Sequence, residues 1–127
     1  MARLASIVFD SFHPAKLARF WAEALDGYAV RAYDAAEIAR LAALGFTPET
    51  DPSVAIDGPG PTVFLQKSDS ATTTRNRIHL DIEVSTGATR SAEVERLERI
   101  GASIRDTRDD HTVMLDPEGN QFCVFGP

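Results

Sequence analysis

Residues 77–84, with the sequence RIHLDIEV, alternate between polar and apolar side chains along their whole length. A β-strand turns successive side chains to opposite faces of its sheet, so this alternation predicts a strand. The apolar face, which we expect to be buried under helices, carries Ile78, Leu80, Ile82 and Val84. The polar face carries His79, Asp81 and Glu83. This polar row fits either a solvated sheet surface or the lining of a reactive pocket, with Glu83 at its solvated rim.

The residues that follow predict a helix and three more strands. In 88–102, Val94, Leu97 and Ile100 recur at helical spacing and Gly101 ends the pattern. The sequence DPEGN at 116–120 predicts a turn, in which Gly119 or Asn120 takes a positive φ. Short apolar runs predict strands at 103–107, 112–115 and 121–125.

The first half of the chain repeats this order with one addition. A strand is predicted from Leu4, and a helix over 13–27 places Phe20 and Trp21 in the core. The addition is the segment DAAEIARLAALG at 34–45, which predicts an extra helix. The remaining strands are predicted at 28–33, 53–57 and 62–67. Both halves therefore run strand, helix and three strands over roughly 60 residues, which indicates two copies of one structural unit.

Composition narrows the class of protein. The 127 residues suit one domain, and the net charge of −6 disfavours nucleic acid and anionic membranes as partners. No apolar run approaches the roughly 20 residues of a membrane span. One cysteine, Cys123, allows no intrachain disulfide and indicates a reducing compartment. We therefore expect a soluble cytoplasmic protein.

Three segments carry a family resemblance. NRIHLD at 76–81, DPEGNQFCV at 116–124 and FDSFHPAKLARFWAEALDG at 9–27 resemble a glyoxalase-like domain of the vicinal oxygen chelate superfamily. The resemblance implies an α+β fold in which two paired βαβββ modules form a curved mixed sheet, shaped as a cup, with the helices outside. One glyoxalase-like domain would then span 1–127, with module one at about 1–70 and module two at about 76–127.

The resemblance also implies where a metal would bind. Superfamily members include glyoxalases, extradiol dioxygenases and metal-free drug-binding proteins of the bleomycin resistance type, and the enzymes use a divalent metal as a Lewis acid. Their ligand positions, usually His and Glu, fall here on Ser6, Gln66, His79 and Cys123. Serine and glutamine bind hard cations weakly. We therefore expect no tightly bound cofactor, and a weakly held divalent metal with His79 as a ligand stays open.

The remaining pocket residues have two interpretations each. Phe64 shares a strand face with Gln66 and is expected in the pocket. Asp81 is expected to accept a hydrogen bond from His79 or from the loop at 72–77. Cys123 is either a small buried side chain, which is favoured, or a thiolate nucleophile beside His79. His111, which lies before a strand, either edges the pocket mouth or occupies a loop, and His13 is assigned no chemistry.

Two functions follow from these residues. The first is a protein that binds a small organic molecule in a pocket with a degenerate metal site. The alternative is a lyase or isomerase that moves a proton beside a carbonyl, with His79 as base or metal ligand. We expect the pocket to be complete within one chain, and any homodimer to form through the outer surface.

Overall fold

The computed structural model describes residues 1, 4–69 and 78–127. The chain divides into two compact units, Met1–Ser70 and Ala71–Pro127, which we call module one and module two.

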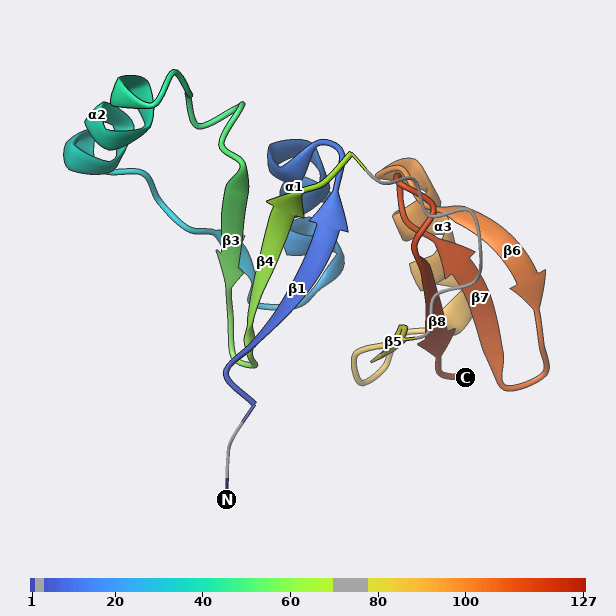
Figure 1. The fold of residues 1–127 in the computed structure, drawn as a ribbon. Coiled ribbons are helices and arrows are strands. Elements are labelled where there is room, and N and C mark those ends of the chain that lie inside the picture. Colours follow the sequence, from blue (N-terminus) through green and yellow to red (C-terminus); the bar gives the residue numbers. More distant parts are fainter. Residues whose placement is uncertain (2–3, 70–77) are drawn as a thin grey trace. The chain divides into compact units, whose positions relative to one another are not determined.

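Module one is a four-stranded sheet with two helices (Figure 1). Its strands lie in the order β1-β4-β3-β2, with β1 parallel to β4 and the other neighbours antiparallel. Its elements are β1 (Ser6–Ser11), α1 (Pro14–Ala24), β2 (Ala29–Val30), α2 (Ala35–Ala43), β3 (Ser53–Asp57) and β4 (Thr62–Lys67).

Module two repeats this topology with one helix. Its strand order is β5-β8-β7-β6, again with the first pair parallel and the others antiparallel. Its elements are β5 (Leu80–Glu83), α3 (Arg90–Arg99), β6 (Ser103–Thr107), β7 (His111–Leu115) and β8 (Gln121–Phe125). The α+β class and the two βαβββ units are confirmed, with α2 as the addition to module one. The joining of both sheets around one concave face stays a prediction.

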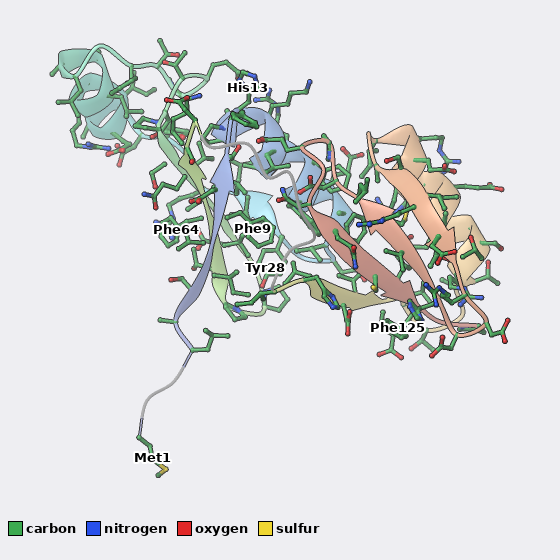
Figure 2. The ribbon with its side chains drawn as sticks, turned by 45° about the vertical axis from the view of Figure 1, so that its right-hand side comes forward. Met1, Phe9, His13, Tyr28, Phe64 and Phe125 are labelled. Atoms are coloured by element: carbon green, nitrogen blue, oxygen red, sulfur yellow. The ribbon has the colours of Figure 1, made fainter. Side chains whose placement is uncertain are left out.

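Helix α1 supplies the core of module one. Pro14 stands in its first turn, where the missing N–H costs no intrahelical hydrogen bond. Trp21 is 1% exposed and packs edge-on against Phe9 of β1, with ring centroids 5.6 Å apart. Phe64 points to the opposite side of the sheet from Phe9 (Figure 2). The core positions predicted for Phe20 and Trp21 are confirmed.

Helix α3 covers one face of the module-two sheet. Thr89 caps it, since its hydroxyl oxygen accepts a hydrogen bond from the Ala92 N–H at 3.3 Å. Val94 and Leu97 are its buried side chains. On the sheet, Met114 and Phe122 are paired residues of one face and are 0% and 1% exposed. The neighbouring residues Val113 and Cys123 therefore lie on the other face.

The predicted turn at 116–120 joins β7 to β8 through a buried carboxylate. Asp116 is 3% exposed, and its Oδ1 accepts hydrogen bonds from the backbone N–H groups of Glu118 and Asn120 at 2.9 Å each. Its Oδ2 accepts from the Asn120 side chain at 2.8 Å. Gly119 has a φ of +85°, as the turn prediction requires. The turn thereby sets the pairing of β7 with β8.

Strand β5 differs from expectation. It begins at Leu80, and Leu80 and Ile82 are half-buried where full burial was predicted. Ile78 is 83% exposed. The physical reason is position: β5 is the edge strand of its sheet, while α3 packs mainly against β6, β7 and β8. The alternation identified the strand correctly, but it could not tell an edge strand from a central one.

In the described part of the chain, no helix is both long enough and apolar enough to cross a membrane.

Candidate functional site

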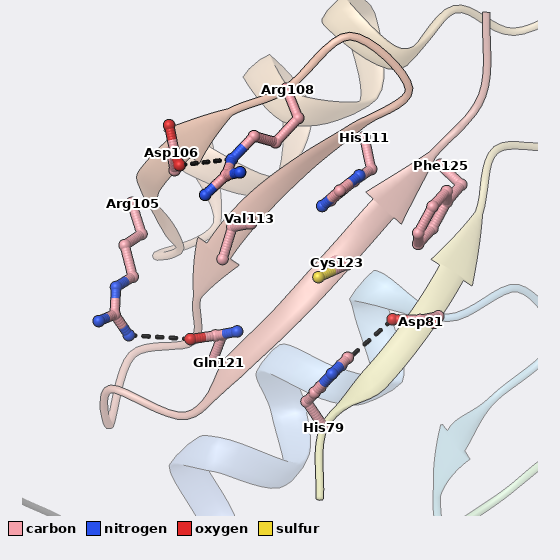
Figure 3. Close-up of a pocket in the computed structure, with 10 residues that line it drawn as sticks. All are labelled: His79, Asp81, Arg105, Asp106, Arg108, His111, Val113, Gln121, Cys123 and Phe125. Carbon is pink, nitrogen blue, oxygen red and sulfur yellow. Dashed lines mark hydrogen bonds and ion pairs between the residues drawn. The ribbon is translucent and has the colours of Figure 1, made fainter. Parts of the chain in front are cut away.

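A pocket of about 430 Å³ lies on the face of the module-two sheet that carries Val113 and Cys123 (Figure 3). This is the face opposite to Met114 and Phe122. The volume is in the range of small-molecule sites. The pocket is lined by His79, Asp81, Arg105, Asp106, Arg108, His111, Val113, Gln121, Cys123 and Phe125.

The sheet register brings the pocket residues together. Cys123 of β8 lies level with Asp81 of β5 on one side and Val113 of β7 on the other. Gln121 stands two residues earlier on the same face of β8, and Phe125 two residues later. Three adjacent strands thus present polar and apolar side chains side by side, and two of these residues, Asp81 and Cys123, are 42 positions apart in the sequence.

His79 and Asp81 form the edge of the pocket at β5. The His79 Nδ1 atom lies 3.2 Å from Oδ1 of Asp81, and the side chains are 31% and 57% exposed. The contact is at ion-pair distance but lacks hydrogen-bond geometry. Nδ1 is shielded from solvent and has no hydrogen-bond partner among the described residues.

Cys123 completes a three-donor cluster with these two residues. One ligand atom from each of His79, Asp81 and Cys123 lies within 4.8 Å of the others. Ligands about 2.0–2.3 Å from a zinc ion lie about 3.5 Å apart in tetrahedral geometry, so these side chains would have to move inward by about 1 Å. Nitrogen, oxygen and sulfur donors suit Zn²⁺ better than Mg²⁺ or Ca²⁺. The residues therefore fit a soft or borderline divalent ion loosely.

The cluster shares His79 and Cys123 with the ligand positions implied by the resemblance and adds Asp81. Alternate residues on a strand stand about 6.6 Å apart along its axis, so a metal shared by His79 and Asp81 requires the two side chains to lean together. In the structure the two side chains lean together, so Asp81 joins His79 and Cys123. The loop at 72–77, the other partner considered for Asp81, lies outside the described residues. Cys123 itself is 5% exposed, as the small buried side chain of the favoured interpretation would be.

The opposite side of the pocket carries arginines from β6 and the segment that follows it. The Arg105 Nη1 group donates to Oε1 of Gln121 at 2.8 Å, and Arg108 Nε donates to Oδ2 of Asp106 at 2.6 Å. Sequence patterning did not single out any of these four residues. The only signal was charge in 103–110, which is equally typical of a solvated strand and turn.

His111 is the first residue of β7, where the sequence placed a loop. Its ring stacks on Phe125 at a centroid distance of 4.9 Å, and its Nδ1 atom lies 2.7 Å from Oδ1 of Asp110. The hydrogen bond with His111 lowers the pKa of the Asp110 carboxyl. His111 lines the pocket, as expected, but on the sheet rather than in a loop.

The other predicted site residues belong to module one. Ser6 pairs with Thr62, and Gln66 pairs with Asp10. Ser6 and Gln66 therefore share a sheet face but stand four residues apart along the ladder, about 13 Å. Ser6 is half-buried and Gln66 is exposed. The structure does not bring these two side chains together in a module-one counterpart of the cluster.

Phe64 lines a pocket of about 320 Å³ within module one. There Arg31 lies over the Phe64 ring at 5.7 Å and donates to both Asp57 oxygens at 2.8 and 2.9 Å. Tyr33 donates to Oδ2 of Asp51 at 2.7 Å, and burial together with Asp51 raises the pKa of the Tyr33 hydroxyl strongly. The charged and polar groups of this pocket thus stabilise one another.

Comparisons with known proteins agree with this fold. Residues 6–125 match the family model described as a glyoxalase-like domain. No curated protein sequence matches the chain significantly.

Several solved structures are similar. The fosfomycin resistance protein FosX from Mesorhizobium loti has a TM-score of 0.69 at 13% identity, over 100% of this chain and 94% of that one. A glyoxalase/bleomycin resistance protein/dioxygenase family enzyme from Burkholderia phytofirmans has a TM-score of 0.64 at 15% identity, over 97% of each chain. A hypothetical protein from S. aureus has a TM-score of 0.66 at 15% identity, over 100% and 95%. At these identities the likeness concerns the fold.

Proposed function

The chain belongs to the glyoxalase-like family, and on that premise we propose that it binds a small organic molecule in the module-two pocket. The observation that carries this proposal is the convergence of β5, β7 and β8 on one 430 Å³ pocket. Superfamily members bind small molecules and often metals. Small-molecule sites usually combine apolar walls with a few polar groups. This pocket has an apolar strip of Val113, Cys123 and Phe125 among seven polar or charged residues.

The apolar and the polar lining residues contribute differently to binding. Val113 and Phe125 give apolar contact, and burial of ligand surface against them supplies affinity. His79 offers a ring nitrogen at the β5 edge, and Gln121 offers an amide on β8. These polar groups fix the orientation of the ligand, because a polar group left unpaired inside the pocket costs binding free energy.

The second candidate is an enzyme that transfers a proton beside a carbonyl. The position of Asp81 supports it, because a carboxylate 3.2 Å from Nδ1 leaves Nε2 of His79 as the acceptor for a substrate proton. His79 would then hold the abstracted proton at Nε2 and return it to a neighbouring carbon. Asp81 would stabilise the imidazolium that forms in between.

A divalent metal fits this second candidate. His79, Asp81 and Cys123 would hold it, and it would supply Lewis-acid stabilisation of a developing oxyanion. Asp81 would then serve as a ligand. Elemental analysis of protein purified without a histidine tag separates the alternatives: we expect well under one equivalent of metal. A full equivalent that His79→Ala removes would favour the metal enzyme.

The binding proposal is tested by a melting-shift screen with small carbonyl compounds, aromatic compounds and organic acids. A ligand at 100 times its Kd stabilises the fold by about 2.7 kcal/mol. We expect such stabilisation in the wild type and in His13→Ala, the matched control from module one, and its loss in His79→Ala. If no compound shifts the melting curve, or if the shift survives His79→Ala, the proposal is wrong.

Isomerase chemistry has its own readout. Incubation of candidate carbonyl compounds in D₂O should then replace the hydrogen beside the carbonyl by deuterium, as seen by proton NMR. His79→Ala would abolish that exchange. Ligand binding with no exchange supports the first function and excludes the second for the compounds tested.

A further inference from the structure

Arg105 lines the pocket with a neutral side chain as its partner. Five other arginines donate to carboxylates, namely Arg19, Arg31, Arg40, Arg96 and Arg108, and Arg90 donates to the backbone carbonyl of Asp109 at 3.0 Å. The Arg105 guanidinium instead donates to the amide oxygen of Gln121 at 2.8 Å. Within the described residues it has no carboxylate partner. The Arg105 guanidinium therefore has no directly bonded counter-charge, and the carboxylates in the pocket lining are those of Asp81 and Asp106.

A β-bulge directs this side chain into the pocket. Ile104 pairs with Met114 and Asp106 pairs with Val113, so Arg105 is the extra residue between two register positions. In a regular strand Arg105 and Asp106 would point to opposite faces, yet both line the pocket (Figure 3). Asp106 is engaged by Arg108 at 2.6 Å, so it does not neutralise its neighbour.

Gln121 holds the guanidinium in place. This amide is 8% exposed, and it occupies one of the five N–H donors of Arg105. The donors that remain form the planar fork that binds a carboxylate through two parallel hydrogen bonds. We infer that Arg105 is an anion subsite, and that the ligand of this pocket is a small organic acid whose carboxylate binds there. The inference rests on the proposed binding function and names its ligand class.

The register also indicates the size of the acid. Gln121 and Cys123 are alternate residues on one face of β8, about 6.6 Å apart. Val113 lies level with Cys123 and with Asp106, between the arginine side of the pocket and His79. A carboxylate on Arg105 would therefore place a short apolar chain or single ring over Val113, with its far end near Cys123 and His79.

The test compares acids with neutral amides of the same shape. Butyrate, succinate and benzoate are titrated by calorimetry against butyramide, succinamide and benzamide. In the wild type we expect at least one acid to bind about 10- to 100-fold more tightly than its amide, the range for hydrogen bonds to a charged group. Arg105→Gln should reduce this ratio to about one. Arg99→Gln, which removes the same charge from the exposed end of α3, should keep it.

A second variant tests the neutral partner. Gln121→Glu keeps the shape of the side chain but places a carboxylate beside Arg105, and it should abolish the preference for acids. Amides that bind as tightly as acids, in a manner sensitive to His79→Ala, would overturn the anion subsite and leave the binding function intact. Equal losses in Arg105→Gln and Arg99→Gln would overturn it as a net-charge effect. Absence of any binding sensitive to His79→Ala would overturn both proposals.

Discussion

Modules one and two share one topology but differ in how their polar groups are satisfied. In module one, Arg31 is fully paired with Asp57 and lies over Phe64. In module two, Arg105 has only a neutral partner, and Nδ1 of His79 has no hydrogen bond among the described residues. The same strand order thus supports one sheet face with compensated charges and one with charges available to a ligand.

The two modules carry different residues at equivalent strand positions. Phe64 stands two residues after the start of β4, and Cys123 stands two residues after the start of β8. Phe64 lies level with Val8 and Ala55, whereas Cys123 lies level with Asp81 and Val113. Topology sets where a side chain stands, and the residue types at those places set which chemical groups the sheet face presents.

The largest expected effect is on the core of module one. Trp21→Ala removes a side chain that is 1% exposed and packs on Phe9 and Phe20. We expect a loss of about 3–5 kcal/mol in the free energy of unfolding, because a large buried ring leaves a cavity. Urea unfolding measures it. A loss under about 1 kcal/mol would contradict the view that α1 stabilises module one through this ring.

The next effect concerns the turn that aligns β7 and β8. Asp116→Ala removes a buried carboxylate that accepts three hydrogen bonds. We expect a loss of about 2–3 kcal/mol, since hydrogen bonds to a charged group are among the stronger ones. The exposed control Asp109→Ala should change stability by less than about 0.5 kcal/mol. Equal effects of both variants on urea unfolding would contradict the view that the Asp116 carboxylate stabilises the turn between β7 and β8.

His79→Ala should show the reverse pattern, with little effect on stability. The side chain is 31% exposed, and no hydrogen bond holds it among the described residues. We expect a loss below about 1 kcal/mol, together with the loss of ligand binding. Asp81→Ala should be similarly mild, because an exposed ion pair contributes about 0–1 kcal/mol. A strongly destabilised His79→Ala protein would make His79 a structural residue instead.

The smallest effect is the pH dependence of module one. Arg31 and Thr62 lower the pKa of Asp57 to about 2. A lowered folded-state pKa means that the carboxylate stabilises the fold above about pH 4, its unfolded value, and that this contribution is lost as the pH falls toward 2. The contribution is small because the pair is half-exposed.

Urea unfolding between pH 5 and pH 2 compares the two modules in the pH dependence of stability. Asp57→Asn should reduce the fall in the free energy of unfolding that occurs as the pH decreases. Arg105→Gln should leave the decline unchanged, because its partner Gln121 does not titrate. An unchanged decline in Asp57→Asn would show that the Arg31 pair makes no measurable contribution.

The sequence predicted the elements well, because alternation and helical spacing are local properties. The strand at 77–84, the turn at Gly119 and the buried Trp21 all depend on near neighbours in the chain. Burial of Leu80 and Ile82 was wrong because it depends on where β5 lies in the sheet. Edge and central strands share the same local pattern.

Strand parity and the family resemblance predicted part of the pocket lining, since the resemblance pointed to Cys123. Parity placed His79 and Asp81 on one face, but it could not show that their side chains lean together. Arg105 was missed because a bulge breaks the parity rule, and 103–107 shows no mark of a bulge in its residues. Ser6 and Gln66 were assigned by resemblance, and the β1–β4 register separates them.

Amide NMR spectra of the labelled protein, titrated with the tightest-binding compound of the screen, test most directly whether module two holds the ligand. We predict the largest shifts at 121–125 of β8 and at Arg105 and Asp106 of β6, and their loss in His79→Ala. Shifts concentrated instead around Tyr33, Asp51 and Phe64, and unchanged in His79→Ala, would contradict the assignment of function to module two.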